Sequence, residues 1–225
     1  MKNKIEKVAV LGAGTMGAQI AGHLANAGIP SCLFDISQEL AENGVGMLTS
    51  LKPAPLYKPK NASLIEACNY DDHLEKIKDA DWIVEAVAEN LDIKHQVYTN
   101  IAEYIKSSAI ISSNTSGIPL GDLTQVMSDD VKSRFLITHF FNPPRYMRLL
   151  ELVKGPDTAD DIYNDMSIFG EDILGKGIVH AKDTPNFIGN RIGVHGGNNA
   201  IRLAIKMGLT CEEVDKLSGT IVGRP

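Results

Sequence analysis

The sequence of 225 residues predicts an α/β protein: a doubly wound, mostly parallel sheet followed by the first helices of an all-α second domain. Three observations support this prediction. A glycine-rich turn follows the first apolar run, further short apolar runs alternate with helix-period stretches, and beyond residue 184 the pattern is helical. We therefore expect a domain of residues 1–184 and the start of a second, truncated domain in residues 185–225.

The first part of this pattern is a strand, a turn and a helix. Residues 8–11 (Val-Ala-Val-Leu) lead into Gly-x-Gly-x-x-Gly at residues 12–17. Apolar residues recur at helical spacing over residues 16–27 and stop at Gly28, a good helix C-cap. The order strand, glycine turn and helix is typical of the Rossmann-like dinucleotide-binding fold.

Each glycine of this turn has a predicted role in holding a dinucleotide. Gly12 permits the tight turn, Gly14 lets the backbone approach a pyrophosphate, and Gly17 lets the helix pack against the sheet. Thr15 and Met16 lie between them, at the helix N-terminus. Free N–H groups and the positive end of the helix dipole favour an anion there, so all five residues are expected to contact the cofactor.

The second predicted strand, residues 31–35, ends in Asp35. This carboxylate can accept hydrogen bonds from both hydroxyls of an adenosine ribose, and it repels a 2′-phosphate. Ile36 and Ser37, which follow it, offer no arginine to bind such a phosphate. The expected cofactor is therefore NAD rather than NADP.

The remaining sequence continues the alternation up to residue 184 and then changes. Further strands are expected at residues 81–87, 109–112, 135–140, 149–153 and 177–181, with helices at residues 91–105, 119–127 and 160–174. The last pair of strands is expected to run antiparallel at an edge. Residues 50–60, with three prolines and three lysines, predict an exposed loop. A long helix is expected over residues 186–207, and Thr210 and Glu213 form a capping box that begins a shorter helix.

Composition excludes several classes of protein. The net charge of −6 argues against a nucleic-acid surface, which needs a basic face. No stretch approaches the roughly 20 apolar residues that cross a bilayer, and no apolar signal region precedes the first strand, so we expect no membrane insertion. Cys32, Cys68 and Cys211 have no metal-binding spacing, and we interpret them as reduced thiols of a cytoplasmic protein without a metal site.

A histidine and a glutamate are the candidates for acid–base chemistry. His139 is near the end of the strand at residues 135–140, and an imidazole can take a hydroxyl proton while hydride leaves the same carbon. Glu151 lies in an apolar strand, where a carboxylate is costly unless paired, so His139 is its expected partner. The alternative is a structural histidine at a strand end.

Ligands of open α/β sheets bind beyond the carboxyl ends of the strands, so polar residues there are further candidates. Asn114 and Ser116 follow the strand at residues 109–112, and Asn142 follows the strand that carries the histidine. Asn190 lies in the first helix of the second domain. Ser116 and Asn190 would hydrogen-bond a reacting oxygen; the alternatives are a turn residue and a helix cap.

Four segments follow one another along the chain: Asn-Thr-Ser at residues 114–116, His-Phe-Phe-Asn-Pro at 139–143, Leu-Leu-Glu-Leu-Val at 149–153 and Asp-Thr-Pro-Asn-Phe-Ile-Gly-Asn-Arg at 183–191. In order, and nearly in spacing, they resemble the signature of L-3-hydroxyacyl-CoA dehydrogenases, over essentially the whole chain. The similarity is closest to the multifunctional bacterial fatty-acid oxidation type, in which a hydratase domain can accompany the dehydrogenase on a longer polypeptide.

The resemblance implies NAD-dependent oxidation of L-3-hydroxyacyl-CoA to 3-oxoacyl-CoA, in fatty acid β-oxidation. His139 is then the base, with Glu151 as its partner. Ser116 and Asn190 then contact the substrate, and Asn142 lies near the nicotinamide. The resemblance further implies an acyl-CoA substrate, a homodimer for the complete protein, and a fused or associated enoyl-CoA hydratase. A truncated second domain is expected to allow NAD(H) binding with little or no turnover.

Two sets of charged residues are also interpreted through the resemblance. It places Glu89 and Lys94 close to the cofactor, although Lys94 is alternatively a solvated helix residue. Shorter members of the family have a long helical arm that contacts coenzyme A. This chain instead has Lys52, Lys58 and Lys60 on the proline-rich loop. They are either contacts for CoA phosphates or solvated loop residues.

Two other functions are weighed against this one. A dehydrogenase of the hydroxyisobutyrate or phosphogluconate type shares the sheet but resembles proteins with a catalytic lysine in the interdomain helix. Residues 186–205 contain Arg191 and Arg202 but no lysine, which argues against it. An NAD-binding structural or sensor protein would keep the fold without turnover. The presence of both His139 and Glu151 disfavours that function.

Overall fold

The computed structural model describes residues 4–222; residues 1–3 and 223–225, at the ends of the two predicted domains, lie outside the described part. The chain divides into two compact units, Met1–Thr184 and Pro185–Pro225, which are described separately. Within the described residues, no helix is both long enough and apolar enough to span a bilayer.

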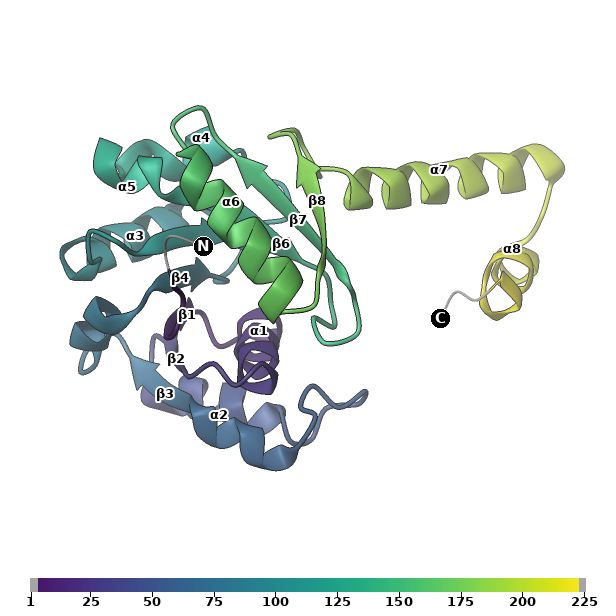
Figure 1. Ribbon diagram of the computed structural model, residues 1–225. Helices are drawn as coiled ribbons and strands as arrows, with labels where there is room; N and C mark the ends of the chain where they lie inside the picture. Colours follow the sequence, from purple (N-terminus) through teal and green to yellow (C-terminus); the bar gives the residue numbers. More distant parts are fainter. Residues whose placement is uncertain (1–3, 223–225) are drawn as a thin grey trace. The chain divides into compact units, whose positions relative to one another are not determined.

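The first unit is built on an eight-stranded sheet in the order β3-β2-β1-β4-β5-β6-β7-β8 (Figure 1). Neighbouring strands are parallel except β6 and β7. The strands are β1 (Val8–Leu11), β2 (Ser31–Asp35), β3 (Ile65–Asn69), β4 (Trp82–Glu85), β5 (Ile110–Ser113), β6 (Phe135–Phe140), β7 (Leu149–Lys154) and β8 (Gly177–Ala181). The predicted doubly wound, mostly parallel sheet is confirmed.

The strand order places a ligand site at the centre of the sheet. The chain builds β2 and β3 on one side of β1, then returns to the other side with β4, β5 and β6. The connections after β1 and β4 therefore leave the sheet in opposite directions, which opens a crevice beyond their carboxyl ends.

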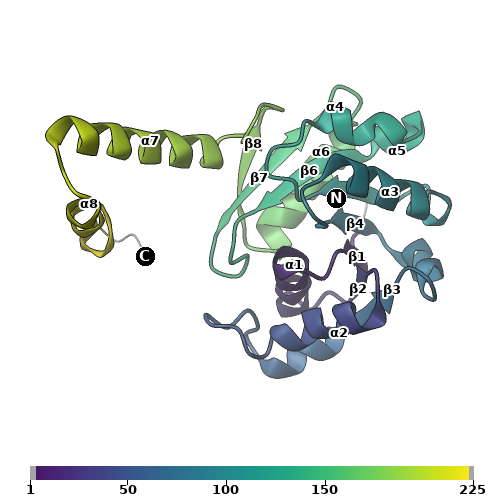
Figure 2. The ribbon, with the colours of Figure 1, turned by 180° about the vertical axis from the view of Figure 1, so that it is seen from behind.

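Helices cover both faces of the sheet. Figure 1 has α6 in front of the sheet, and Figure 2 has α3 on the opposite face. On the α6 face, the rings of Trp82 and Phe169 meet edge to face with centroids 5.8 Å apart. On the α3 face, Tyr98 packs against Phe135 in the same way, also at 5.8 Å. The helices of this unit are α1 (Thr15–Asn26), α2 (Gln38–Met47), α3 (Leu91–Ile101), α4 (Leu120–Leu123), α5 (Asp129–Ser133) and α6 (Asp160–Ile168).

Among the helices and strands of the first unit, α2, α5 and β3 were not predicted. The sequence of α2 contains Gly44 and Gly46 and few apolar residues, so its helical signal is weak. Gly44 is nevertheless required, because a Cβ there would lie 2.7 Å from the Ala13 carbonyl oxygen. β3 is an edge strand with the exposed Glu66 in its middle, and it therefore lacks the apolar run of a central strand.

The predicted position of the antiparallel pair is wrong. The last two strands, β7 and β8, are parallel, and the antiparallel neighbours are β6 and β7. The physical reason is the connection. Only a short segment without a helix joins β6 to β7, whereas α6 lies between β7 and β8 and provides the crossover that a parallel pair needs.

The proline-rich loop at residues 50–60 is only partly exposed. Its three lysines are exposed as predicted, but Leu56 is buried. Arg145, from the connection between β6 and β7, donates a hydrogen bond to the Leu56 carbonyl at 2.9 Å and lies over the Tyr57 ring at 4.4 Å. These contacts attach the loop to the end of the sheet that carries the histidine.

The second unit consists of α7 (Gly189–Met207), α8 (Cys211–Ser218) and a short 3-10 helix, Thr220–Val222. Gly208 ends α7 in the left-handed conformation, with φ +67°. The Thr210 hydroxyl accepts from the backbone of Glu213, whose carboxylate accepts from the backbone of Thr210. The predicted helix stop and capping box are confirmed.

Candidate active site

The glycine turn between β1 and α1 has three different constraints. Gly12 has φ +103°, and a Cβ there would lie 2.7 Å from the Ala86 carbonyl oxygen. A Cβ on Gly17 would lie 1.8 Å from the Gly12 carbonyl oxygen. Glycine is therefore required at this position mainly by the turn itself, whereas the sequence predicted that packing of the helix against the sheet requires it. Gly14, by contrast, faces open space with no atom within 4 Å of an ideal Cβ. That space lies beside the first turn of α1.

A hollow of about 610 Å³ lies beyond the carboxyl ends of β1, β2, β4 and β5, and we call it the cofactor hollow. Eight predicted site residues line it. They are Gly12, Gly14, Thr15, Met16, Asp35, Glu89, Asn114 and Ser116. The lining is completed by Ile36, Tyr70, Ala86, Val87, Ala88, Ile93 and Val97. The sheet order thus brings together side chains that are far apart in the sequence.

Asp35 is fixed by backbone hydrogen bonds at the edge of the hollow. Its Oδ2 accepts from the Ala13 amide at 2.7 Å, and its Oδ1 accepts from the Ile36 amide at 2.8 Å. The carboxylate is therefore held against the glycine turn, in position for a ligand that lies along the turn. Ile36 is exposed beside it.

Tyr70 is a lining residue that the sequence did not reveal, because it follows the unpredicted strand β3. Its ring stacks on Phe34 with centroids 5.7 Å apart. Its buried hydroxyl has no hydrogen-bond partner in the structure. Burial, and then the nearby charges of Asp35 and Glu85, raise the pKa of the Tyr70 hydroxyl. Open space at the glycine turn, a fixed acid and an unpartnered hydroxyl together fit a bound dinucleotide.

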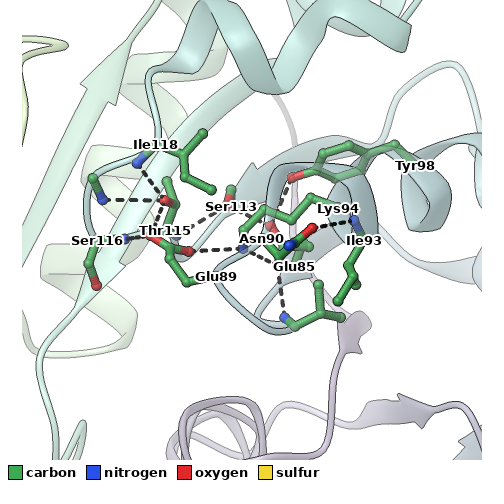
Figure 3. A network of polar contacts seen from close by, with 12 residues as sticks. Glu85, Glu89, Asn90, Ile93, Lys94, Tyr98, Ser113, Thr115, Ser116 and Ile118 are labelled. Atoms are coloured by element: carbon green, nitrogen blue, oxygen red, sulfur yellow. Dashed lines mark hydrogen bonds and ion pairs between the residues drawn. The ribbon is translucent and has the colours of Figure 1, made fainter.

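A buried polar network lies behind the hollow, at the ends of β4 and β5 (Figure 3). Its centre is Glu85, which is 0% exposed. Its Oε1 accepts from Lys94 Nζ at 2.7 Å and from the Val87 amide at 2.8 Å. Its Oε2 accepts from the Ser113 hydroxyl at 2.6 Å and from the Tyr98 hydroxyl at 2.9 Å. Four donors thus compensate a fully buried carboxylate.

Lys94 belongs to this network and does not line the hollow. Its side chain is 1% exposed, so the alternative of a solvated helix residue is wrong. Its ammonium group lies 2.7 Å from Glu85 and 3.3 Å from Glu89 Oε2. Lys94 is thus connected to the hollow through its contact with Glu89.

Glu89 connects the network to the predicted substrate-binding turn. Its Oε1 accepts from the Thr115 hydroxyl at 2.6 Å and from the Ser116 amide at 2.8 Å (Figure 3). Partial burial raises the pKa of Glu89, but hydrogen bonds from Thr115 and Ser116 and the charge of Lys94 outweigh it and lower that pKa overall. The charged form of Glu89 thus holds Ser116, which is exposed on the hollow.

The predicted pair of histidine and glutamate is present. His139 and Glu151 are directly opposite each other in the antiparallel pair β6 and β7. His139 Nδ1 lies 2.7 Å from Glu151 Oε2, and the side chains are 4% and 0% exposed. The Phe141 ring lies beside the imidazole, with centroids 4.5 Å apart. A buried carboxylate fixes the imidazole through Nδ1, which is the arrangement of an oriented general base.

Two asparagines follow the ends of β5 and β6. Asn114 accepts a hydrogen bond from the Phe140 amide at 2.9 Å, which joins the two strand ends. Asn142 does not line the hollow; its side-chain oxygen accepts from Gln19 at 3.0 Å. Gln19 lies on α1, two residues beyond the glycine motif, so it ties Asn142 to the helix whose first turn borders the hollow. No sequence pattern indicated this link.

Asn190 lies on α7, in the second unit. Its contact with a substrate stays a prediction.

Comparison with known proteins was made for the whole chain. The profile described as "3-hydroxyacyl-CoA dehydrogenase, NAD binding domain" matches residues 7–184. A probable 3-hydroxyacyl-CoA dehydrogenase of Bacillus subtilis (strain 168) is 44% identical over 246 residues, covering 100% of this chain and 31% of the relative. A putative fatty acid oxidation complex trifunctional enzyme of Rickettsia prowazekii (strain Madrid E) is 39% identical, covering 100% of this chain and 32% of the relative.

Solved structures are similar as well. The crystal structure of (S)-3-hydroxybutyryl-CoA dehydrogenase PaaH1 from Ralstonia eutropha superimposes with a TM-score of 0.84 at 30% identity, covering 99% of this chain and 79% of that one. The present chain spans about a third of the length of the two curated relatives above.

Proposed function

The chain belongs to the 3-hydroxyacyl-CoA dehydrogenase family, and from this premise we propose that it carries the NAD-binding and acid–base parts of an enzyme that oxidises L-3-hydroxyacyl-CoA to 3-oxoacyl-CoA. The observation that carries the proposal is the buried pair of His139, near the carboxyl end of β6, and Glu151, in the amino-terminal half of β7. NAD, when bound, accepts the hydride that leaves the substrate carbon.

In this proposal the pair moves the proton. His139 takes the hydroxyl proton of the substrate on Nε2, because Nδ1 faces Glu151. The charge of Glu151 stabilises the imidazolium that forms and keeps the ring in one orientation. In the reverse direction the same imidazolium returns the proton. Burial of the pair keeps water away from this exchange and strengthens the electrostatic interaction.

The other predicted residues position the two ligands. Asp35 accepts the ribose hydroxyls of the cofactor, and the turn at Gly14 accepts its pyrophosphate. Tyr70 lines the same hollow. Ser116 holds the reacting oxygen in line, with Asn190 of the second unit, and that positioning contributes to the rate. Asn142 lies near the nicotinamide, held by Gln19.

The wider assembly is part of the proposal. An acyl-CoA substrate, a homodimer and an associated enoyl-CoA hydratase rest on the family and on the trifunctional relative of Rickettsia. The place of the reaction in fatty acid β-oxidation rests on the same relative. A cytoplasmic location agrees with the three free cysteines.

The test is to titrate NADH by fluorescence and to assay acetoacetyl-CoA reduction, on the protein at its full natural length. We expect tight NADH binding and turnover of about 1–10³ per second. NADH binding without turnover on any acyl-CoA would favour the sensor function instead. Turnover on a short hydroxy acid but not on an acyl-CoA would favour the hydroxyisobutyrate type.

A further inference from the structure

Two cysteines and a glutamate meet on one face of the edge strands β2 and β3, away from the cofactor hollow. Cys32 on β2 is directly opposite Glu66 on β3, and Cys68 lies two residues further along β3. Residues two apart in a strand project from the same face, so all three side chains gather there. Their two Sγ atoms and a carboxylate oxygen all lie within 4.8 Å of one another.

The geometry of this cluster fits a metal ion. Cys32 Sγ lies 3.8 Å from Glu66 Oε2. Tetrahedral Zn²⁺ with metal–ligand distances of about 2.0–2.3 Å places its ligand atoms roughly 3.5–3.8 Å apart. The ligand set, two thiolates and a carboxylate, is typical of thiophilic divalent cations. Closing the cluster to this geometry therefore requires only small movements of the side chains.

The charges around the cluster also fit. Two thiolates and one carboxylate carry three negative charges, and a divalent cation leaves one of them. Lys76 contacts the other carboxylate oxygen of Glu66, Oε1, so it balances the remaining charge without occupying the ligand atom that faces the thiol. The lysine thus acts as an outer partner that orients the carboxylate.

An ion can reach the cluster from solvent. A hollow of about 430 Å³ opens at the amino ends of β1, β2 and β3, and its lining includes Cys32, Glu66 and Lys7. Cys32 and Cys68 are otherwise buried, at 2% and 0% exposure. With three ligands from the protein, a tetrahedral ion has a fourth position that water can occupy.

We propose that Cys32, Cys68 and Glu66 form a binding site for a thiophilic divalent cation of the Zn²⁺ type, which clips the edge strand β3 to β2. The clip stabilises the strand that ends in Asp35 and the strand that precedes Tyr70. None of the three ligand residues is among the residues that line the cofactor hollow, so the proposed metal site is distinct from the cofactor site.

The test uses reduced protein under anaerobic conditions, titrated with Co²⁺ as a spectroscopic probe. We expect a thiolate-to-cobalt charge-transfer band that saturates at one equivalent and disappears when Zn²⁺ is added. Cys32→Ser and Cys68→Ser should abolish the band. Glu66→Gln, a change on an exposed side chain, should weaken binding at least about tenfold, since loss of even an outer partner of a ligand costs 10–100-fold.

The matched control is Cys211→Ser. Cys211 is exposed on α8, in the other unit, and its loss should leave the band unchanged. A second readout is the thermal unfolding midpoint, which Zn²⁺ should raise in the native protein and in Cys211→Ser but not in Cys68→Ser. The proposal is overturned if no band forms, if the band survives Cys68→Ser, or if it is lost with Cys211→Ser.

Discussion

Glu85 and Glu151 are both glutamates with 0% exposure at the carboxyl-end region of the same sheet, yet their surroundings differ. Glu85 receives four hydrogen bonds, one of them from the ammonium group of Lys94. Glu151 faces the imidazole of His139, a side chain of the type that acts as a general acid or base.

The role of a buried carboxylate therefore depends on the side chain that it faces. With a lysine and three neutral donors around it, Glu85 holds the loop after β4. With an imidazole as its partner, Glu151 instead holds the ring of His139 in one orientation.

The largest effect is expected on turnover, from changes to the pair of His139 and Glu151. His139→Gln should lower turnover by about 10²–10⁴, the range typical of a general base, while NADH affinity and the free energy of unfolding change little. Glu151→Gln should lower turnover less and shift the pH–rate profile of oxidation to lower pH, because the imidazolium loses the charge that favours it. Steady-state kinetics over a pH series measure both. Near-normal turnover in the His139 variant would assign the chemistry to another residue.

Breaking the pair of Lys94 and Glu85 should instead lower the free energy of unfolding. Lys94→Met leaves Glu85 buried without its cation, and breaking such a pair costs about 3–5 kcal/mol of unfolding free energy. The control is Lys7→Met, which removes a largely exposed ion pair with Asp79 and should cost about 0–1 kcal/mol. Urea unfolding of both variants measures the difference. If Lys94→Met lowered the free energy of unfolding as little as the control does, the proposed difference between the surroundings of Glu85 and Glu151 would be contradicted.

Asp35 is a third acid at a strand end, and backbone amides hold its carboxylate. Asp35→Ala removes the acceptor of the ribose hydroxyls, and a hydrogen bond to a charged group is worth about 1.5–3 kcal/mol. NADH should therefore bind at least about tenfold more weakly, and the preference over NADPH should narrow. The control is Asp71→Ala, an exposed acid outside the hollow. Equal affinity of the native protein for the two nucleotides would contradict the assignment.

The smallest effect is expected at Glu89, the partly exposed member of the network. Its pKa in the folded protein is lowered from 4.5, so the unfolded chain binds more protons as the pH falls. Its contribution to stability is present above pH 4.5 and is lost as the pH falls through the lower, folded pKa. In Glu89→Gln, the free energy of unfolding should fall less steeply as the pH is lowered. Glu39→Gln, on an exposed part of α2, should leave this pH dependence unchanged. If the pH dependence of stability in Glu89→Gln equals that of the native protein, Glu89 does not stabilise the fold in this way.

Much of this molecule was readable from the sequence because the signals are local. The glycine turn, the acid at the end of β2 and the capping box of α8 each depend on residues within one or two turns of one another. The pairing of His139 with Glu151 was also predictable, since an unpaired carboxylate in an apolar strand is too costly. The same argument applies to Glu85, which ends the apolar strand β4, and it would have found that network as well.

The sequence alone was enough to predict the fold class, the glycine turn after β1 and the pairing of His139 with Glu151. Only the tertiary structure decided the buried position of Lys94, the unpartnered hydroxyl of Tyr70, the link from Gln19 to Asn142 and the cluster of Cys32, Glu66 and Cys68. Each of these joins segments that are distant in the chain. Strand order and register bring them together, and those are set by packing of the whole sheet rather than by any local pattern.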